Sequence, residues 1–73
     1  MRSFTDQEGA TWDAAIERES YGAYRLIFAR RSGHELRHLL LEASTFDDAR
    51  SELDGLSEPA LRERLARAEP WAV

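Results

Sequence analysis

The chain has 73 residues, with 10 Lys or Arg against 14 Asp or Glu and a formal net charge of −4. This length predicts one small domain, residues 1–73, with little room for a deep pocket beside its core, which disfavours an enzyme. The lack of Cys excludes disulfides and thiolate metal sites, and no apolar run is long enough to span a membrane. The chain contains no Lys, so all ten residues counted as Lys or Arg are Arg, and the N-terminus lacks an apolar signal segment. We therefore expect a bacterial, cytoplasmic protein.

The N-terminal segment has the pattern of a β-hairpin. A short strand is expected over residues 2–5, and residues 6–9 have the acid and the glycine that a type I turn favours. The next strand, 10–18, alternates between apolar and polar residues, which predicts one face toward a core. That face is expected to carry Trp12, Ala14 and Ile16.

A second hairpin is predicted over residues 23–41. Its first strand, 23–30, is rich in aromatic and β-branched residues, and its loop, 31–34, contains a glycine that can adopt a positive φ. The last strand, 36–41, has apolar residues on both faces because it holds three consecutive Leu. We expect Tyr24, Leu26, Phe28, Leu36 and Leu40 toward the core, and Arg25, Ile27, Arg37, Leu39 and Leu41 on the outer face.

Two short helices are expected in the C-terminal third. Thr45 is a suitable N-cap, with two Asp following it, and Gly55 ends that helix. Ser57 is the N-cap of a second helix, which Pro70 stops. Trp71 then either covers apolar surface or stays exposed as an anchor.

The order of these elements predicts an α+β fold. We expect an antiparallel meander of three or four strands, followed by two short α-helices that pack on one face. The predicted core consists of Phe4, Trp12, Ile16, Tyr24, Leu26, Phe28, Leu36, Leu40, Phe46, Ala49, Leu53, Leu56, Leu61 and Leu65.

Charge is distributed unevenly along the chain. Residues 18–38 hold five Arg and two Glu, a net +3, whereas residues 39–58 hold six acids and one Arg, a net −5. The acids partly suit a helix N-terminus. The most localised basic feature is the loop tip, where Arg30, Arg31 and His34 could meet phosphates or carboxylates.

The predicted function is a small, non-enzymatic protein-binding or regulatory module. Apolar residues rimmed by Arg on the outer face would mark a partner site or a homodimer interface. The alternative for this face is that Trp71 and the C-terminal tail fold back over it, or that a helix covers it. The alternative is a small nucleic-acid-binding transcriptional regulator that uses the Arg-rich hairpin, which the neighbouring acidic helix disfavours. The candidate binding residues are Arg25, Ile27, Arg30, Arg31, His34, Arg37 and Leu39.

No cofactor, metal or catalytic residue is expected. His34, His38 and Glu42 are each four residues apart, which on a helix would suit a metal ion. On a strand, residues four apart lie roughly 13 Å apart, at 3.3 Å per residue, too far to share one ion. The sequence also contains no nucleophile motif and no phosphate-binding glycine loop.

Overall fold

The structure is a computed structural model that describes residues 1–19 and 22–71. It confirms the α+β prediction, with one strand more than expected in this part of the chain. No helix among these residues is long and apolar enough to cross a bilayer. The elements are β1 (Arg2–Thr5), β2 (Thr11–Arg18), β3 (Tyr24–Arg30), β4 (Leu36–Leu41), α1 (Phe46–Gly55), α2 (Glu58–Arg67) and β5 (Glu69–Pro70).

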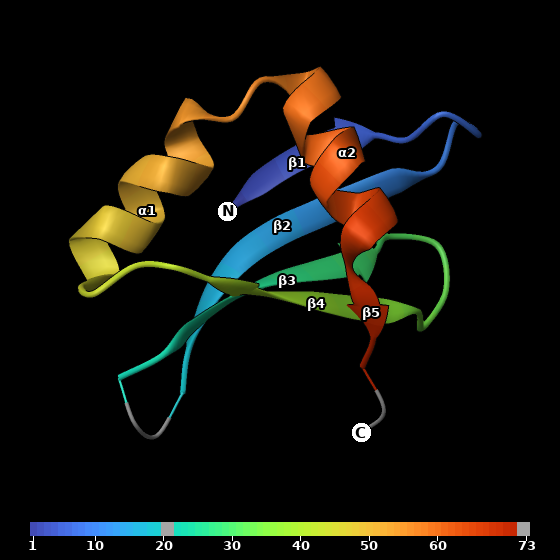
Figure 1. The fold of residues 1–73 in the computed structure, drawn as a ribbon. Helices are drawn as coiled ribbons and strands as arrows, with labels where there is room; N and C mark the ends of the chain where they lie inside the picture. Colours follow the sequence, from blue (N-terminus) through green and yellow to red (C-terminus); the bar gives the residue numbers. More distant parts are fainter. Residues whose placement is uncertain (20–21, 72–73) are drawn as a thin grey trace.

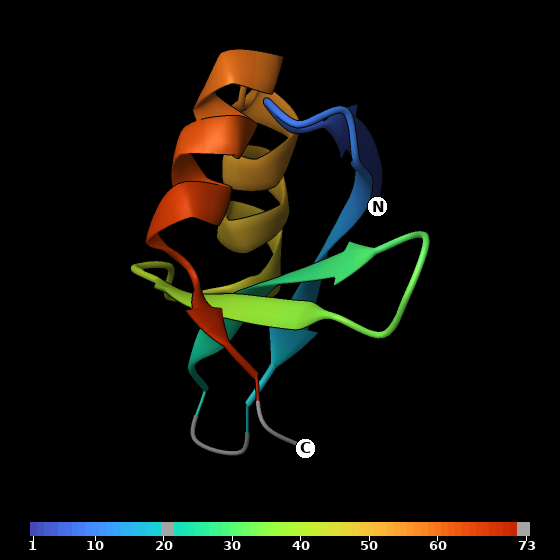
Figure 2. The same ribbon diagram turned by 90° about the vertical axis from the view of Figure 1, so that its right-hand side faces the viewer.

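The strands form one antiparallel sheet in the order β1-β2-β3-β4-β5. Both helices lie on the same side of this sheet, as Figures 1 and 2 show from two directions. α1 packs against β2 and β3, and α2 crosses from β1 to β4. The unpredicted strand, β5, brings the chain back from α2 to pair with β4. The sheet therefore has one helix-covered face, called here the inner face, and one outer face.

Local chemistry explains where the first turn and both helices begin. The carboxylate of Asp6 accepts hydrogen bonds from the backbone N–H groups of Glu8 (2.8 Å) and Ala10 (2.9 Å), which closes the first turn. Thr45 Oγ1 accepts from the third residue of its helix at 3.1 Å, and Ser57 Oγ does the same at 3.3 Å. These side chains satisfy N–H groups that a helix leaves without partners.

The C-terminal end of α1 is stabilised from another part of the chain. Its last turn contains no basic residue. Instead, the guanidinium of Arg2 in β1 donates to the carbonyl of Leu53 at 3.0 Å and to the carbonyl of Leu56. A cation at this position interacts favourably with the negative end of the helix dipole. Arg2 thereby ties the first strand to the first helix, 51 residues away in sequence.

The core lies between the inner face and the two helices. It contains no buried polar or charged residue among those described. Phe28, Leu26 and Leu61 are its largest fully buried side chains, and Ile16 and Leu56 pack at its edge. The buried set is Phe4, Trp12, Ala14, Tyr24, Leu26, Phe28, Leu41, Ala49, Leu53, Leu61 and Leu65.

The predicted phase of β4 is wrong. Residues that face each other in the register share a side of the sheet, and Arg37, Leu39 and Leu41 lie opposite the buried residues of β3. These three side chains are therefore on the inner face. Leu36 and Leu40, both predicted as core, are on the outer face, where Leu36 is half-buried and Leu40 is 57% exposed.

β4 can adopt this phase because Arg37 is accommodated at the margin of the core. Its guanidinium lies over the ring of Trp12, 5.2 Å from the ring centroid, and pairs with Glu35 at 2.7 Å. Its long aliphatic chain can cover apolar surface while its charge stays solvated. Phe46 is also misassigned, because it stands at the margin beside Tyr24 and is 46% exposed.

Candidate functional site

The outer face of the sheet is the main candidate site. No helix in the described part of the chain covers it, since α1 and α2 both pack on the other face. The pairing of β2, β3 and β4 places apolar side chains next to one another in the middle of this face. These residues, called here the apolar patch, are Ala15, Ile27, Ala29, Leu36, Leu40 and Trp71.

Trp71 joins the patch because the chain continues along β4 after β5. Its backbone N–H donates to the carbonyl of Leu36 at 2.9 Å, which extends the antiparallel pairing. Its ring lies 5.2 Å from the imidazole of His38, measured between centroids, at 60°. Trp71 is thus half-buried on the outer face, and it covers part of that face rather than the helix-side core.

A polar cluster borders the patch at β3. Arg25 Nε donates to Glu19 Oε1 at 2.5 Å, and Arg25 Nη1 lies 2.8 Å from His38 Nδ1. Because a guanidinium only donates hydrogen bonds, Nδ1 of His38 must accept, which assigns the ring proton to Nε2. The cluster holds Arg25, His38 and Trp71 in a fixed arrangement, with Arg25 28% exposed.

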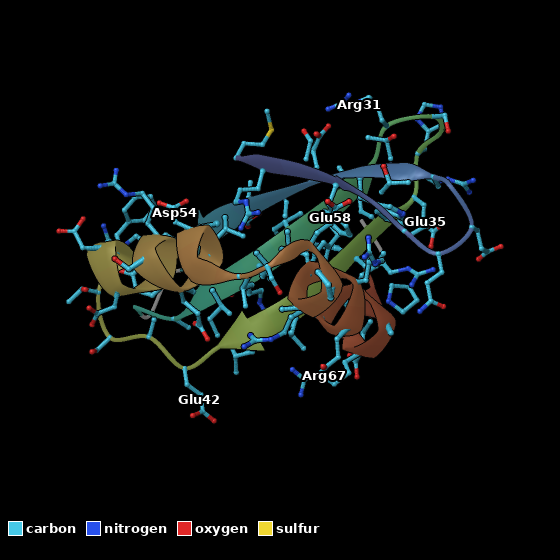
Figure 3. All side chains as sticks on the ribbon, turned by 90° about the horizontal axis from the view of Figure 1, so that it is seen from above. Arg31, Glu35, Glu42, Asp54, Glu58 and Arg67 are labelled. Atoms are coloured by element: carbon cyan, nitrogen blue, oxygen red, sulfur yellow. The ribbon has the colours of Figure 1, made fainter. Side chains whose placement is uncertain are left out.

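A second polar cluster lies at the β1 side of the outer face. Arg31 Nη2 donates to Asp13 Oδ1 at 2.6 Å and to Ser3 Oγ at 2.8 Å, and Ser3 Oγ lies 2.6 Å from Asp13 Oδ1. These hydrogen bonds, first from Arg31 and then from Ser3, lower the pKa of Asp13. The same hydrogen bond from Arg31 to Asp13 raises the pKa of Arg31. Arg31 is therefore hydrogen-bonded to side chains of β1 and β2 rather than free at the loop tip. Figure 3 shows where Arg31 lies.

The seven predicted site residues do not form one surface. Arg25 and Ile27 lie on the outer face, as predicted. Arg37 and Leu39 lie on the inner face, so the prediction that they lie beside Ile27 on the outer face is wrong. Arg30 and His34 are exposed in the β3–β4 region, where Arg30 is 3.9 Å from Glu35. Arg31 is in the Asp13 cluster.

Sequence reasoning placed Leu36, His38 and Leu40 on the wrong side of the sheet, and it left open whether Trp71 covers the outer face. The alternation of β4 is the only local signal for the first three, and its run of three Leu fits either phase. Trp71 follows Pro70, and nothing nearby in sequence indicates which face it meets. Arg37 acted as a misleading signal, because a charged residue is usually assigned to solvent.

An open groove lies on the helix side, between the first turn and α2. It has a volume of about 620 Å³, more space than the sequence alone led us to expect. Its charged lining includes Asp6, Glu8 and Glu63 together with Arg37 and Arg62. The indole of Trp12 donates to Asp6 Oδ2 at 2.7 Å, and this hydrogen bond, the main cause, lowers the pKa of Asp6. A carboxylate with a lowered pKa is a weak base.

Among the described residues, no group of three His, Cys, Asp or Glu is placed to hold a metal ion. No protein-family model, curated protein or solved structure matches this chain. The outer face is therefore interpreted from its geometry.

Proposed function

We propose that this chain is a small, non-enzymatic protein-binding module whose outer face docks onto an apolar surface of another protein. The observation that carries the proposal is the apolar patch, which lies on the face that the two helices leave open. Its most exposed member is Leu40, at 57%. Burying apolar surface is worth about 25 cal/mol per Å², so covering the patch contributes favourable free energy to the binding of a partner.

The border of the patch supports recognition by a protein. Leu40 lies opposite Arg25 in the register, and Ile27 lies opposite His38, so polar groups stand directly beside the apolar ones. Arg25 and Glu19 neutralise each other before any partner arrives. An apolar centre with a polar margin is the usual arrangement of a protein interface. An interface of about 800 Å² per partner would cover roughly one sixth of the 4931 Å² surface.

The ion pairs of the hairpin favour this function over nucleic-acid binding. Arg25 pairs with Glu19, Arg31 with Asp13, and Arg30 and Arg37 both with Glu35. Binding to nucleic acid gains from releasing counterions when free cationic side chains neutralise phosphates. Side chains that already have carboxylate partners contribute less to that gain.

We also propose that the module acts without catalysis and in the cytoplasm of a bacterium. The acids of the 620 Å³ groove have no Ser, Cys or His beside them in its lining, and Asp6 is held as a weak base. The absence of Cys suits a reducing compartment, where disulfides do not form.

Site-specific photo-crosslinking tests the proposed function. A photoreactive phenylalanine analogue replaces Leu40 on the patch or, as the matched control, the exposed Ala66 on α2. We expect the Leu40 variant to crosslink one defined protein in cells, and the Ala66 variant to give no such product. The substitution Ile27→Glu should abolish this product while leaving the chain folded, as judged by thermal unfolding.

Two results would contradict the proposed function. One is equal crosslinking at both positions, which indicates random encounters. The other is a crosslinked product of twice the chain mass together with a concentration-dependent dimer in sedimentation, which assigns the patch to a second copy.

A further inference from the structure

The two edges of the sheet differ in how their backbone groups are satisfied. At the β1 edge, the N–H of Thr5 donates to Glu58 Oε1 at 3.3 Å. The carbonyl of Thr5 accepts from Arg62 Nη1 at 3.0 Å. Two side chains of α2 therefore occupy the outward-facing groups of this edge residue. Such occupation is one way that proteins prevent an edge strand from pairing with another chain.

The β4 edge is only partly covered. β5 pairs with Arg37 and His38, whereas residues 39–41 pair with β3 alone in the described part of the chain. The hydrogen bond from Trp71 to the carbonyl of Leu36 shows that the backbone N–H and C=O groups of Leu36 point away from β3. Residues whose backbone groups point toward and away from a given neighbour alternate in an antiparallel ladder, so the backbone groups of Leu40 also point away from β3. Neither backbone group of Leu40 has a hydrogen-bonding partner on that side among the described residues.

A groove runs along this open edge. It has a volume of about 260 Å³ and is lined by the three consecutive Leu of β4 and by charged residues. Figure 3 shows Glu42 and Arg67 on the β4 side of the molecule, on either side of the strand's end. The charged lining residues are Glu42, Glu52, Arg64 and Arg67.

The charges of the groove are ordered along the strand. Glu42 follows the end of β4, and Arg67 ends α2 just before β5. Arg64 is paired with Glu52 at 3.5 Å, whereas Arg67 forms no ion pair with any described residue. A segment added antiparallel to β4 would run from Glu42 toward Arg67. Its N-terminal end would meet an acid, and its C-terminal end would meet an unpaired cation.

We propose that the β4 edge binds the C-terminal end of a partner protein as a short additional strand. The bound segment exchanges two hydrogen bonds with Leu40 and places its terminal carboxylate against Arg67. It must end there, because β5 occupies the same line from Glu69 onward. Three residues of open edge correspond to about 10 Å of strand, so the contact is short and weak. This inference depends on the backbone edge and not on the apolar patch.

An NMR titration of the ¹⁵N-labelled chain tests this proposal. The probe is an acetylated heptapeptide of alternating valine and threonine that ends in glutamate with a free carboxyl group. We expect shifts concentrated at residues 39–41 and slower hydrogen exchange of the Leu40 amide. The same peptide with an amidated C-terminus should bind about fivefold more weakly, as should the free peptide to Arg67→Gln. Arg50→Gln, an exposed cation on α1, is the matched control and should bind as the unmodified chain does.

Several outcomes would overturn the proposal. These are the absence of binding at millimolar peptide, shifts elsewhere than at residues 39–41, and equal binding by the Arg67 and Arg50 variants. A second copy pairing through β4 would appear as a concentration-dependent dimer and would equally overturn it. Ile27→Glu should leave peptide binding unchanged, so a failure of the edge proposal is distinguishable from a failure of the apolar patch.

Discussion

The guanidinium of Arg37 lies over the indole ring of Trp12, 5.2 Å from its centroid. This contact brings β4 and β2 together on the inner face, although β3 lies between them in the sheet. It also places Leu39 and Leu41 toward the helices and leaves Leu40 on the outer face. The composition of the proposed binding face therefore depends on where this one charged residue lies.

The phase of β4 predicts a large loss of stability at one leucine and almost none at its neighbour. Leu41→Ala removes a side chain that is only 5% exposed and should lower the free energy of unfolding by about 2–4 kcal/mol. Leu40→Ala removes an exposed side chain and should change it by less than about 0.5 kcal/mol. Urea unfolding of the two variants measures both values. The opposite order would show that the strand has the other phase.

The contact between Arg37 and Trp12 should be measurable as stability. Arg37→Ala loses the cation–π contact and the apolar cover of its aliphatic chain, an expected cost of about 1–2 kcal/mol. Arg30→Ala is the matched control, because Arg30 shares the partner Glu35 at 3.9 Å but is exposed. Chemical unfolding should therefore rank the Arg37 variant clearly below the Arg30 variant. Equal stabilities would mean that the ring contact contributes nothing.

The link between Arg2 and the end of α1 predicts a local effect. Arg2→Ala removes the only described side chain that donates to the carbonyls of Leu53 and Leu56, and it should cost about 1 kcal/mol. Hydrogen exchange should accelerate most for amides in the last turn of α1. Arg50→Ala, on the exposed side of the same helix, is the comparison. If both variants lose protection equally, Arg2 does not stabilise the helix end.

Acid should weaken the fold through Asp6 and Asp13. Both have a pKa in the folded state below the ordinary value of 3.8, because Trp12 donates to Asp6, and Arg31 and Ser3 donate to Asp13. A carboxyl group with a lowered pKa stabilises the fold above pH 3.8, and that contribution is lost as the pH falls through the folded pKa.

The variants Asp6→Asn and Asp13→Asn should each lose less stability than the unmodified chain between about pH 5 and pH 2. Urea midpoints measured across this range give the slopes. Asp54→Asn, an exposed acid on α1, is the control and should keep the original slope. Identical slopes for all three variants would contradict the assignment.

Local signals determined much of the fold. The first turn and the two helix starts each depend on one side chain and a backbone N–H group about three or four residues further on. These side chains are those of Asp6, Thr45 and Ser57. Their side chains bond nearby N–H groups, so the chemistry is visible in the sequence. Alternation within β2 and β3 likewise identified the inner and outer sides of these strands, including Arg25 and Ile27.

By itself, the sequence determined the order of the first four strands and the two helices, since caps, turns and alternation act between close neighbours. Only the tertiary structure decided which side of β4 faces the helices, because three consecutive Leu satisfy both phases equally well. It also decided that β5 forms and that Trp71 lies against His38, contacts between residues 33 positions apart. The outer face and the open edge of β4 both arise from these distant contacts, which no local pattern encodes.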